Sequence, residues 1–374
     1  MTPRHSISEA KRIVVKIGSA LLVDPDRGTV HRNWLETLAD DIARMRSQGQ
    51  EVIIVSSGAI ALGRRYLGLT DGRLRLESQQ ASAATGMIRL AHAYQEVLAH
   101  HDITVAQVLL TMDDSENRRR YINARNTLGE LLKLSTVPLI NENDTVATDE
   151  IRFGDNDRLA ARVAAMISAD LVVLLSDIDG LYSRDPRTNS DASLVTEVRG
   201  GIPPEIEAMA GKTMSRDGSG GMATKLEAAK VAMGAGVHMI IADGTADHPL
   251  DRLKNGASCT WFLPEANPRA ARKQWIAGSL KPAGAVVLDD GALSALKSGK
   301  SLLPAGVVKV DGEFERGDAV IVKNSAGDEI ARGLIAYSAA DARLIMGYKT
   351  SEIEALLGYR GRDELIHRDD LVLT

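Results

Sequence analysis

The chain has 374 residues, 44% of them apolar and 25% charged, which is enough for two well-packed globular domains. Its formal net charge of -5 provides no overall attraction to nucleic acid or anionic lipid, and an aromatic content of 3% argues against a base-stacking surface. Cys259 is the one cysteine, which excludes an intrachain disulfide and a cysteine-rich zinc site.

Short apolar runs rich in β-branched residues alternate with longer amphipathic stretches, a pattern typical of buried strands and the helices between them. The predicted strands are 12–17, 51–56, 104–109, 137–141, 171–176 and 238–242. The predicted helices are 33–47, 79–101, 121–133, 157–168 and 224–235. This alternation predicts an α/β fold, a three-layer α/β/α sandwich with a mostly parallel central sheet. Binding sites are expected at the carboxyl ends of its strands.

The pattern changes at 264–273, where Pro, Asn, Ala and Arg replace the apolar runs. Short strands separated by glycines follow at 285–288, 307–310, 319–322 and 329–335, with short helices at 291–297 and 351–357. We therefore predict a first domain at 1–265, a linker at 266–275 and a small β-rich, barrel-like domain at 276–374.

Two predicted strands end in groups suited to an anion. Lys16 ends the first strand and precedes Gly18, so an ammonium group lies beside a flexible turn. Ser57 and Gly58 follow the second strand, where exposed backbone amides could cradle an anion. A solvated lysine and an ordinary N-cap serine are the alternative interpretations.

Two clusters of amide and carboxylate side chains follow the fourth strand. The segment 141–144 reads Asn-Glu-Asn-Asp, and the segment 154–157 reads Gly-Asp-Asn-Asp before a helix. Such groups can grip the ammonium of an amino acid, orient lysines or bind magnesium. Turn and N-cap roles are the alternative.

The segment 218–225 is a glycine-rich loop that runs into a helix, a type of loop that brings backbone amides close to phosphates. It lacks the Gly-Lys-Ser/Thr spacing of a Walker A loop, and by itself the pattern also fits a flexible surface loop.

Taken together, the motifs resemble the glutamate 5-kinases, a family within the amino acid kinases. They are Val14-Val15-Lys16-Ile17-Gly18-Ser19, Ser56-Ser57-Gly58-Ala59-Ile60, Asn141-Glu142-Asn143-Asp144, Gly154-Asp155-Asn156-Asp157, Ser176-Asp177 and Ser219 to Lys225. Residues up to about 265 resemble the amino acid kinase fold. The remainder resembles a PUA domain, through 301–306 and Gly317-Asp318.

The resemblance implies that ATP with Mg²⁺ phosphorylates the γ-carboxylate of L-glutamate to γ-glutamyl phosphate. This is the first step of proline biosynthesis, with feedback inhibition by proline. A homo-oligomer, dimer or tetramer, is implied as well, as is transfer of the product to glutamate-5-semialdehyde dehydrogenase.

Carried over by position, the resemblance assigns Ser57, Asp144 and Asn156 to glutamate. Lys16 and Lys225 would flank the transferred phosphoryl group, with Asp157 orienting both. The implied ATP-binding residues are Lys16, Ser176, Asp177, Ser219, Gly220, Gly221, Met222, Ala223, Thr224 and Lys225. No protein residue is assigned to a metal.

Two alternatives remain open. Aspartate, acetylglutamate and carbamate kinases share the kinase fold but would not explain the second domain. An RNA-binding protein would explain a PUA domain, but 276–374 holds 12 Lys and Arg against 15 Asp and Glu, a formal charge of -3. Nucleic-acid modules usually carry a basic face, so we expect no nucleic-acid partner.

We expect a cytoplasmic protein with no membrane contact. The N-terminal residues are polar and include no apolar stretch of signal-peptide length. No segment approaches the roughly 18 to 20 apolar residues that a membrane-spanning helix needs. A single cysteine favours a reducing compartment.

Overall fold

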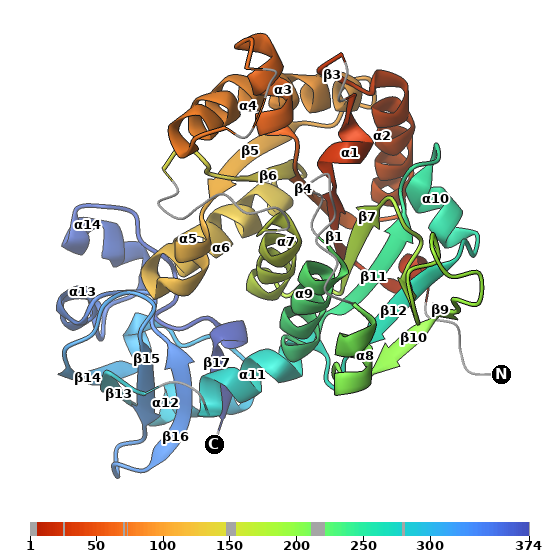
Figure 1. Ribbon diagram of the computed structural model, residues 1–374. Coiled ribbons are helices and arrows are strands. Elements are labelled where there is room, and N and C mark those ends of the chain that lie inside the picture. Colours follow the sequence, from red (N-terminus) through yellow and green to blue (C-terminus); the bar gives the residue numbers. More distant parts are fainter. Residues whose placement is uncertain are drawn as a thin grey trace. The chain divides into compact units, whose positions relative to one another are not determined.

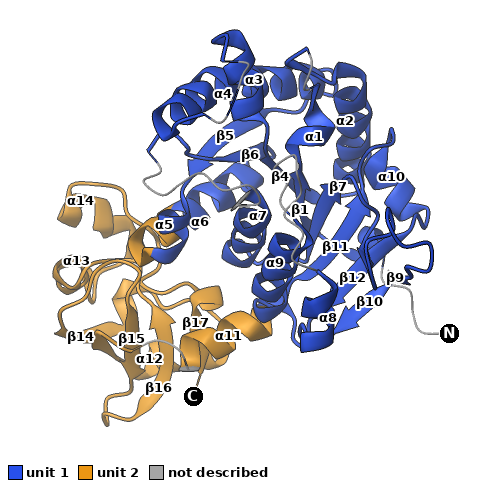
Figure 2. Cartoon of the chain, viewed as in Figure 1, with its two compact units in different colours: residues 1–116, 124–268 blue, residues 117–123, 269–374 orange. Residues whose placement is uncertain are grey.

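The computed structural model describes residues 6–24, 27–69, 72, 74–146, 155–210, 221–278 and 281–373. The chain divides into two compact units, coloured separately in Figure 2. Unit 1 comprises 1–116 and 124–268, and unit 2 comprises 117–123 and 269–374. The predicted linker at 266–275 overlaps helix α11 (Pro268–Gly278), and the predicted domain boundaries remain a proposal.

Unit 1 is built on an eight-stranded sheet with the order β10-β12-β11-β7-β1-β4-β6-β5 (Figure 1). All neighbouring pairs are parallel except β11 and β12. The strands are β1 (Arg12–Ile17), β4 (Glu51–Ser56), β5 (Val105–Leu110), β6 (Val137–Glu142), β7 (Leu171–Ser176), β10 (Glu197–Arg199), β11 (His238–Asp243) and β12 (Cys259–Leu263). The predicted mostly parallel sheet is confirmed.

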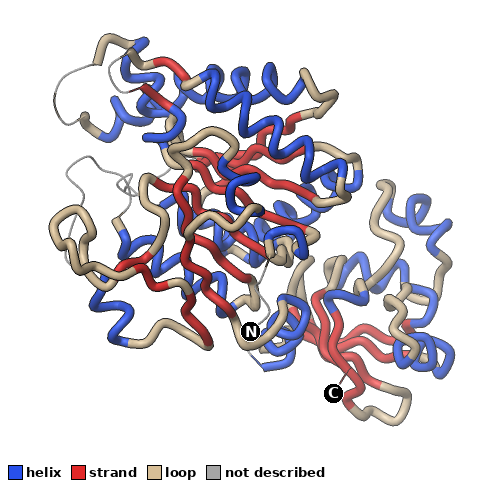
Figure 3. Tube along the Cα trace, turned by 90° about the vertical axis from the view of Figure 1, so that its right-hand side faces the viewer, coloured by secondary structure: helices blue, strands red, loops and turns tan. Residues whose placement is uncertain are grey.

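Helices lie on both faces of this sheet, as the red strands between blue helices in Figure 3 show. They are α1 (Ser19–Leu22), α2 (Arg32–Ser47), α3 (Ala59–Tyr66), α4 (Leu76–Ala99), α5 (Met112–Glu116), α7 (Asp155–Met166), α8 (Pro204–Met209), α9 (Met222–Gly234) and α10 (Pro249–Lys254). Helix α6 (Arg118–Lys133) contributes its first residues to unit 2. The short elements are η1 (Ile7–Glu9) and the two-stranded ribbons β2 (Val23–Asp24) with β3 (Thr29–Val30) and β8 (Leu181–Tyr182) with β9 (Leu194–Val195).

Side-chain alternation along β1 decides which helices its residues face. Ile13, Val15 and Ile17 are fully buried in a core shared with residues of α2 and α4. Because successive side chains of a strand point to opposite faces, Lys16 lies on the other face, where α7 and α9 pack. A lysine is thereby directed into the interior of the layer rather than into solvent.

Unit 2 is a small β-rich body with its own apolar core. Its five-stranded sheet has the order β14-β13-β15-β16-β17 and is antiparallel except for the pair β13 and β15. The elements are β13 (Gly284–Leu288), α12 (Asp290–Lys297), η2 (Pro304–Gly306), β14 (Val307–Gly312), β15 (Ala319–Lys323), β16 (Glu329–Leu334), α13 (Ala339–Ile345), η3 (Thr350–Glu352), α14 (Ile353–Leu357), η4 (Arg368–Asp370) and β17 (Leu371–Leu373). Within the described residues, no helix is long and apolar enough to cross a membrane.

Candidate functional site

The carboxyl ends of four neighbouring strands bring the predicted site residues to one edge of the sheet. The register pairs Ile17 of β1 with Ser56 of β4 on one side and with Leu175 of β7 on the other. Strand β6 runs parallel beyond β4 and ends at Glu142. Loops that are distant in sequence therefore begin side by side, as expected for a parallel sheet.

Asp157 is the centre of a buried ionic cluster at this edge. Its Oδ1 lies 2.5 Å from Nζ of Lys16, and its Oδ2 lies 3.4 Å from Nζ of Lys225. The Asp157 side chain is 0% exposed, and the two lysine side chains are 9% and 8% exposed. Lys16 comes from β1, Asp157 from the first turn of α7 and Lys225 from the first turn of α9.

The cluster carries a net positive charge because two ammonium groups share one carboxylate. Burial by itself would raise the pKa of Asp157, but the charges of Lys16 and Lys225 outweigh burial and hold the pKa below its ordinary value of 3.8. Asp157 is therefore ionised at neutral pH. Two ammonium groups at the edge of the sheet are suited to an anion such as a phosphoryl group.

Ser57 and Asn156 form a second group beside this cluster. Nδ2 of Asn156 donates to Oγ of Ser57 over 3.0 Å, and the backbone N–H of Ser57 donates to the carbonyl oxygen of Ile17 over 3.1 Å. Gly58 follows with φ +105°, and an added Cβ would lie 3.0 Å from Cγ2 of Val23. The turn into α3 therefore favours glycine.

Buried polar contacts support this turn from beneath. Nδ2 of Asn141 donates to the carbonyl oxygen of Ser56 over 2.8 Å, and Oγ of Ser56 lies 3.0 Å from the hydroxyl of Tyr94. The Oδ1 atoms of Asn141 and Asn156 are buried and have no hydrogen-bond partner among the residues that the structure describes. A ligand that brings hydrogen-bond donors, such as an ammonium group, would satisfy such acceptors.

Two of the other predicted residues, Asp144 and Ser176, lie at or just beyond the ends of strands β6 and β7. Asp144 is buried two residues beyond β6. Ser176 ends β7, is buried, and donates from Oγ to Oδ1 of the exposed Asp177 over 3.1 Å. Gly221 precedes α9, whose first residues are Met222, Ala223, Thr224 and Lys225. Gly154, Ser219 and Gly220 lie outside the described residues.

Among the described residues, no group of three or more His, Cys, Asp and Glu could hold a metal ion. Both carboxylate oxygens of Asp157 face ammonium groups, those of Lys16 and Lys225.

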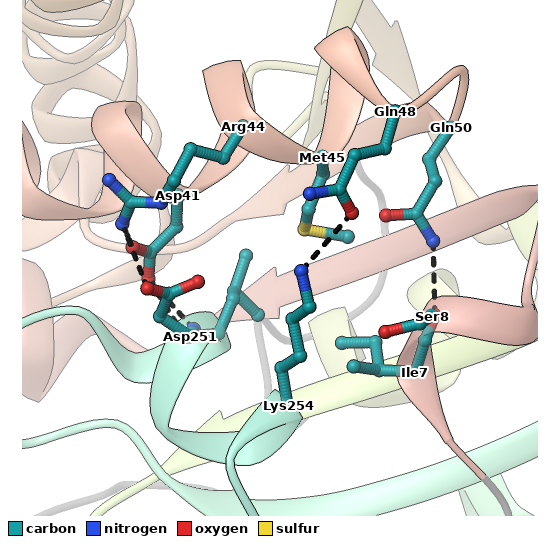
Figure 4. A pocket seen from close by; sticks show the side chains of 10 residues that line it. Ile7, Ser8, Asp41, Arg44, Met45, Gln48, Gln50, Asp251 and Lys254 are labelled. Atoms are coloured by element: carbon teal, nitrogen blue, oxygen red, sulfur yellow. Dashed lines mark hydrogen bonds and ion pairs between the residues drawn. The ribbon is translucent and has the colours of Figure 1, made fainter.

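A separate polar hollow in unit 1, shown in Figure 4, is structural. The buried Asp41 of α2 accepts at Oδ2 from the backbone N–H groups of Leu250 and Asp251 over 2.9 and 3.2 Å. It thereby satisfies the first amides of α10. Lys254 donates to Oε1 of Gln48 over 3.2 Å across the same hollow. The space of about 10 Å³ holds roughly one water molecule.

Comparisons with known proteins agree with this architecture. Residues 11–243 match the Amino acid kinase family, and residues 284–357 match the PUA domain. A glutamate 5-kinase of Paramagnetospirillum magneticum is 65% identical over 367 residues, which cover 98% of this chain and 99% of the relative. A glutamate 5-kinase of Rhodospirillum rubrum is 59% identical over 96% of each chain. The UMP kinase of Bacillus anthracis shares the fold, with a TM-score of 0.50 and 17% identity over 69% of this chain and 97% of that chain.

Proposed function

Because the chain belongs to the amino acid kinase family of phosphotransferases, we propose that it transfers the γ-phosphoryl group of ATP to the γ-carboxylate of L-glutamate. The observation that carries this proposal is the cluster of Lys16, Asp157 and Lys225 beside the pair Ser57 and Asn156. The choice of glutamate as the substrate rests on the names of relatives that are 57 to 65% identical to this chain.

The chemistry explains why lysines and not a general base dominate the site. A carboxylate is already a nucleophile at neutral pH, so no proton has to be removed. Phosphoryl transfer passes through a loose transition state with negative charge on the equatorial oxygens. Lys16 and Lys225 would stabilise that charge, and each well-placed donor is typically worth about 3 kcal/mol. Asp157 would hold both ammonium groups in position.

The remaining residues divide between the two substrates. Ser57, Asp144 and Asn156 would anchor the α-amino and α-carboxylate groups of glutamate. Ser176 and Asp177, together with the loop from Ser219 to Lys225, would bind ATP. Mg²⁺ would neutralise charge on the phosphates of ATP. We place this reaction in the cytoplasm, as the first step of proline biosynthesis.

The test is an assay of the purified protein with ATP, Mg²⁺ and glutamate in the presence of hydroxylamine, which traps an acyl phosphate as a hydroxamate. We expect hydroxamate to form together with ADP and only when glutamate is present. ATP consumption without hydroxamate would contradict phosphorylation of a carboxylate.

We also propose that proline inhibits by occupying the glutamate pocket. Proline presents the same α-carboxylate and ammonium groups but lacks a γ-carboxylate that could be phosphorylated. Asp144→Ala and Asn156→Ala should then weaken glutamate binding and proline inhibition together. Inhibition that saturating glutamate cannot overcome would indicate a separate regulatory site.

The proposal also includes a homo-oligomer and a partner enzyme that receives the product. A dimer or tetramer would couple the pockets of neighbouring subunits, typically by about 1 to 3 kcal/mol. Transfer of the acyl phosphate to glutamate-5-semialdehyde dehydrogenase would protect a product that water hydrolyses. Light scattering measures the number of subunits, and a coupled assay with the dehydrogenase measures the transfer of the acyl phosphate.

A further inference from the structure

Tyr94 is a buried tyrosine of α4 whose hydroxyl faces the end of β4. It is 1% exposed, and its ring packs in the apolar core that includes residues of α2 and α4. Its hydroxyl lies 3.0 Å from Oγ of Ser56, which is itself fully buried. Buried tyrosine hydroxyls usually find a hydrogen-bond partner, and here that partner adjoins the candidate site.

The number of available protons indicates which hydroxyl donates in the hydrogen bond between Tyr94 and Ser56. A serine hydroxyl has one proton to donate. Oγ of Ser56 donates to the carbonyl oxygen of Ser57 over 3.2 Å, so we assign the Tyr94 hydroxyl as the donor in its contact with Ser56. Burial raises the pKa of Tyr94, so the hydroxyl keeps its proton at all physiological pH values.

The resulting chain of hydrogen bonds runs from Tyr94 through Ser56 to the carbonyl oxygen of Ser57. Asn141 holds the preceding carbonyl oxygen, that of Ser56, over 2.8 Å. The backbone on both sides of the Ser57 Cα is thereby held, through the carbonyl oxygens of Ser56 and Ser57. Its orientation sets the position of the Ser57 side chain, which accepts from Asn156.

We propose that Tyr94 is a positioning residue for the amino-acid pocket and acts through Ser56 on Ser57. The inference rests on the proposed function, because it assigns the pocket to glutamate. Lys16, Asp157 and Lys225 lie on β1, α7 and α9, and none of them contacts Tyr94 in the hydrogen bonds of the described residues. Loss of the Tyr94 hydroxyl should therefore affect glutamate binding more than the phosphoryl-transfer step.

The decisive variant is Tyr94→Phe, which keeps the ring and removes one oxygen. We expect the KM for glutamate to rise about 3- to 10-fold, in line with the loss of one buried hydrogen bond. The kcat and the KM for ATP should stay within about twofold of wild type. A purely structural tyrosine would instead lower the melting temperature and leave the KM for glutamate unchanged.

A double-mutant cycle with Ser56→Ala tests the path. If Tyr94 acts through Ser56, the double variant should show the same rise in KM as the more affected single variant. Tyr337→Phe in unit 2 is the matched control, because Tyr337 is also buried and donates its hydroxyl to a carbonyl oxygen, that of Arg362. It should leave the KM for glutamate unchanged.

The outcomes separate the two proposals. A wild-type protein that forms no hydroxamate with glutamate would overturn the proposed function and this inference with it. Normal wild-type turnover with an unchanged KM in Tyr94→Phe would overturn the inference alone. Independent, additive effects of Tyr94→Phe and Ser56→Ala would also overturn it, because they would show that Tyr94 does not act through Ser56.

Discussion

Lys16 and Lys225 share the buried carboxylate of Asp157, at 2.5 and 3.4 Å. We predict that Lys16→Met and Lys225→Met each lower kcat by roughly 10² or more, because each removes a donor to the transition state. Lys230→Met is the control, because Lys230 lies on the same helix as Lys225 but pairs with Glu207 and Glu227 at the surface. A near-normal kcat in either active-site variant, with native circular dichroism, would refute the charge-stabilising role.

The carboxylate of Asp157 makes the free energy of unfolding depend on pH. The pKa of Asp157 lies below its ordinary value of 3.8 in the folded protein, so its contribution is fully present above pH 3.8 and is lost as pH falls through the lower folded pKa. Asp157→Asn should cost about 3 kcal/mol at pH 7, because it removes the carboxylate that both buried ammonium groups contact. The urea unfolding midpoints of the two proteins should begin to converge as pH falls below 3.8 and should meet only below the folded pKa of Asp157. A difference between the two midpoints that stays constant down to the lowest pH measured would contradict a lowered pKa for Asp157.

The sequence contains clear signals for some of these residues and none for others. Lys16, Ser57 and Asn156 end strands or begin a helix beside glycines, so their place at the sheet edge could be predicted. Their roles in binding and catalysis remain predictions. Tyr94 lies within a helix of 24 residues and belongs to no motif. Its importance depends on the packing of α4 behind β4, which only the structure reveals.

At the scale of elements, the strands of the sheet are the best predicted part of the fold. The predicted bounds of β1, β4 and β7 agree with the structure at both ends, because fully buried strands are continuous apolar runs. Helices α11 and α13 were missed. Both helices are short and rich in Ala and Arg, and sequences of this composition also occur in loops. The ribbons β2–β3 and β8–β9 are two residues per strand, too short for any periodicity to appear.

Helices α3 and α4 pack with their backbones in contact at two glycines. A Cβ added to Gly63 would lie 1.7 Å from the carbonyl oxygen of Ser82, and one added to Gly86 would lie 1.8 Å from that of Ala59. We predict that Gly63→Ala separates the helices, destabilises the fold by about 2 kcal/mol or more and, because α3 follows Ser57 and Gly58, raises the KM for glutamate.

Gly129→Ala in α6 is the matched control, because a Cβ there would meet nothing within 4 Å. It should be neutral or stabilising by up to about 1 kcal/mol, since alanine favours the helix. Urea unfolding and glutamate kinetics measure both variants. Equal stability of the two variants would contradict close packing of α3 against α4.

At the scale of the whole molecule, every described residue of the candidate site belongs to unit 1. We predict that deletion of 269–374 leaves a folded kinase with kcat within about tenfold of the full chain, since units with separate cores often fold alone. The deletion starts at α11, because residues from 269 onward group with unit 2. A monodisperse truncated protein without activity would show that unit 2 completes the site.

The most direct measurement compares kcat/KM for glutamate and aspartate, with N-acetylglutamate as a third substrate, in the hydroxamate assay with ATP and Mg²⁺. In the proposed function, Ser57, Asp144 and Asn156 would anchor the α-amino and α-carboxylate groups, so the shorter side chain of aspartate should fall short of the phosphoryl group. One methylene usually gives about 10- to 200-fold discrimination, and we predict a preference for glutamate in that range or above. N-acetylglutamate should react little, because its amide carries no ammonium group. Equal kcat/KM for glutamate and aspartate would contradict the assignment of this site to glutamate.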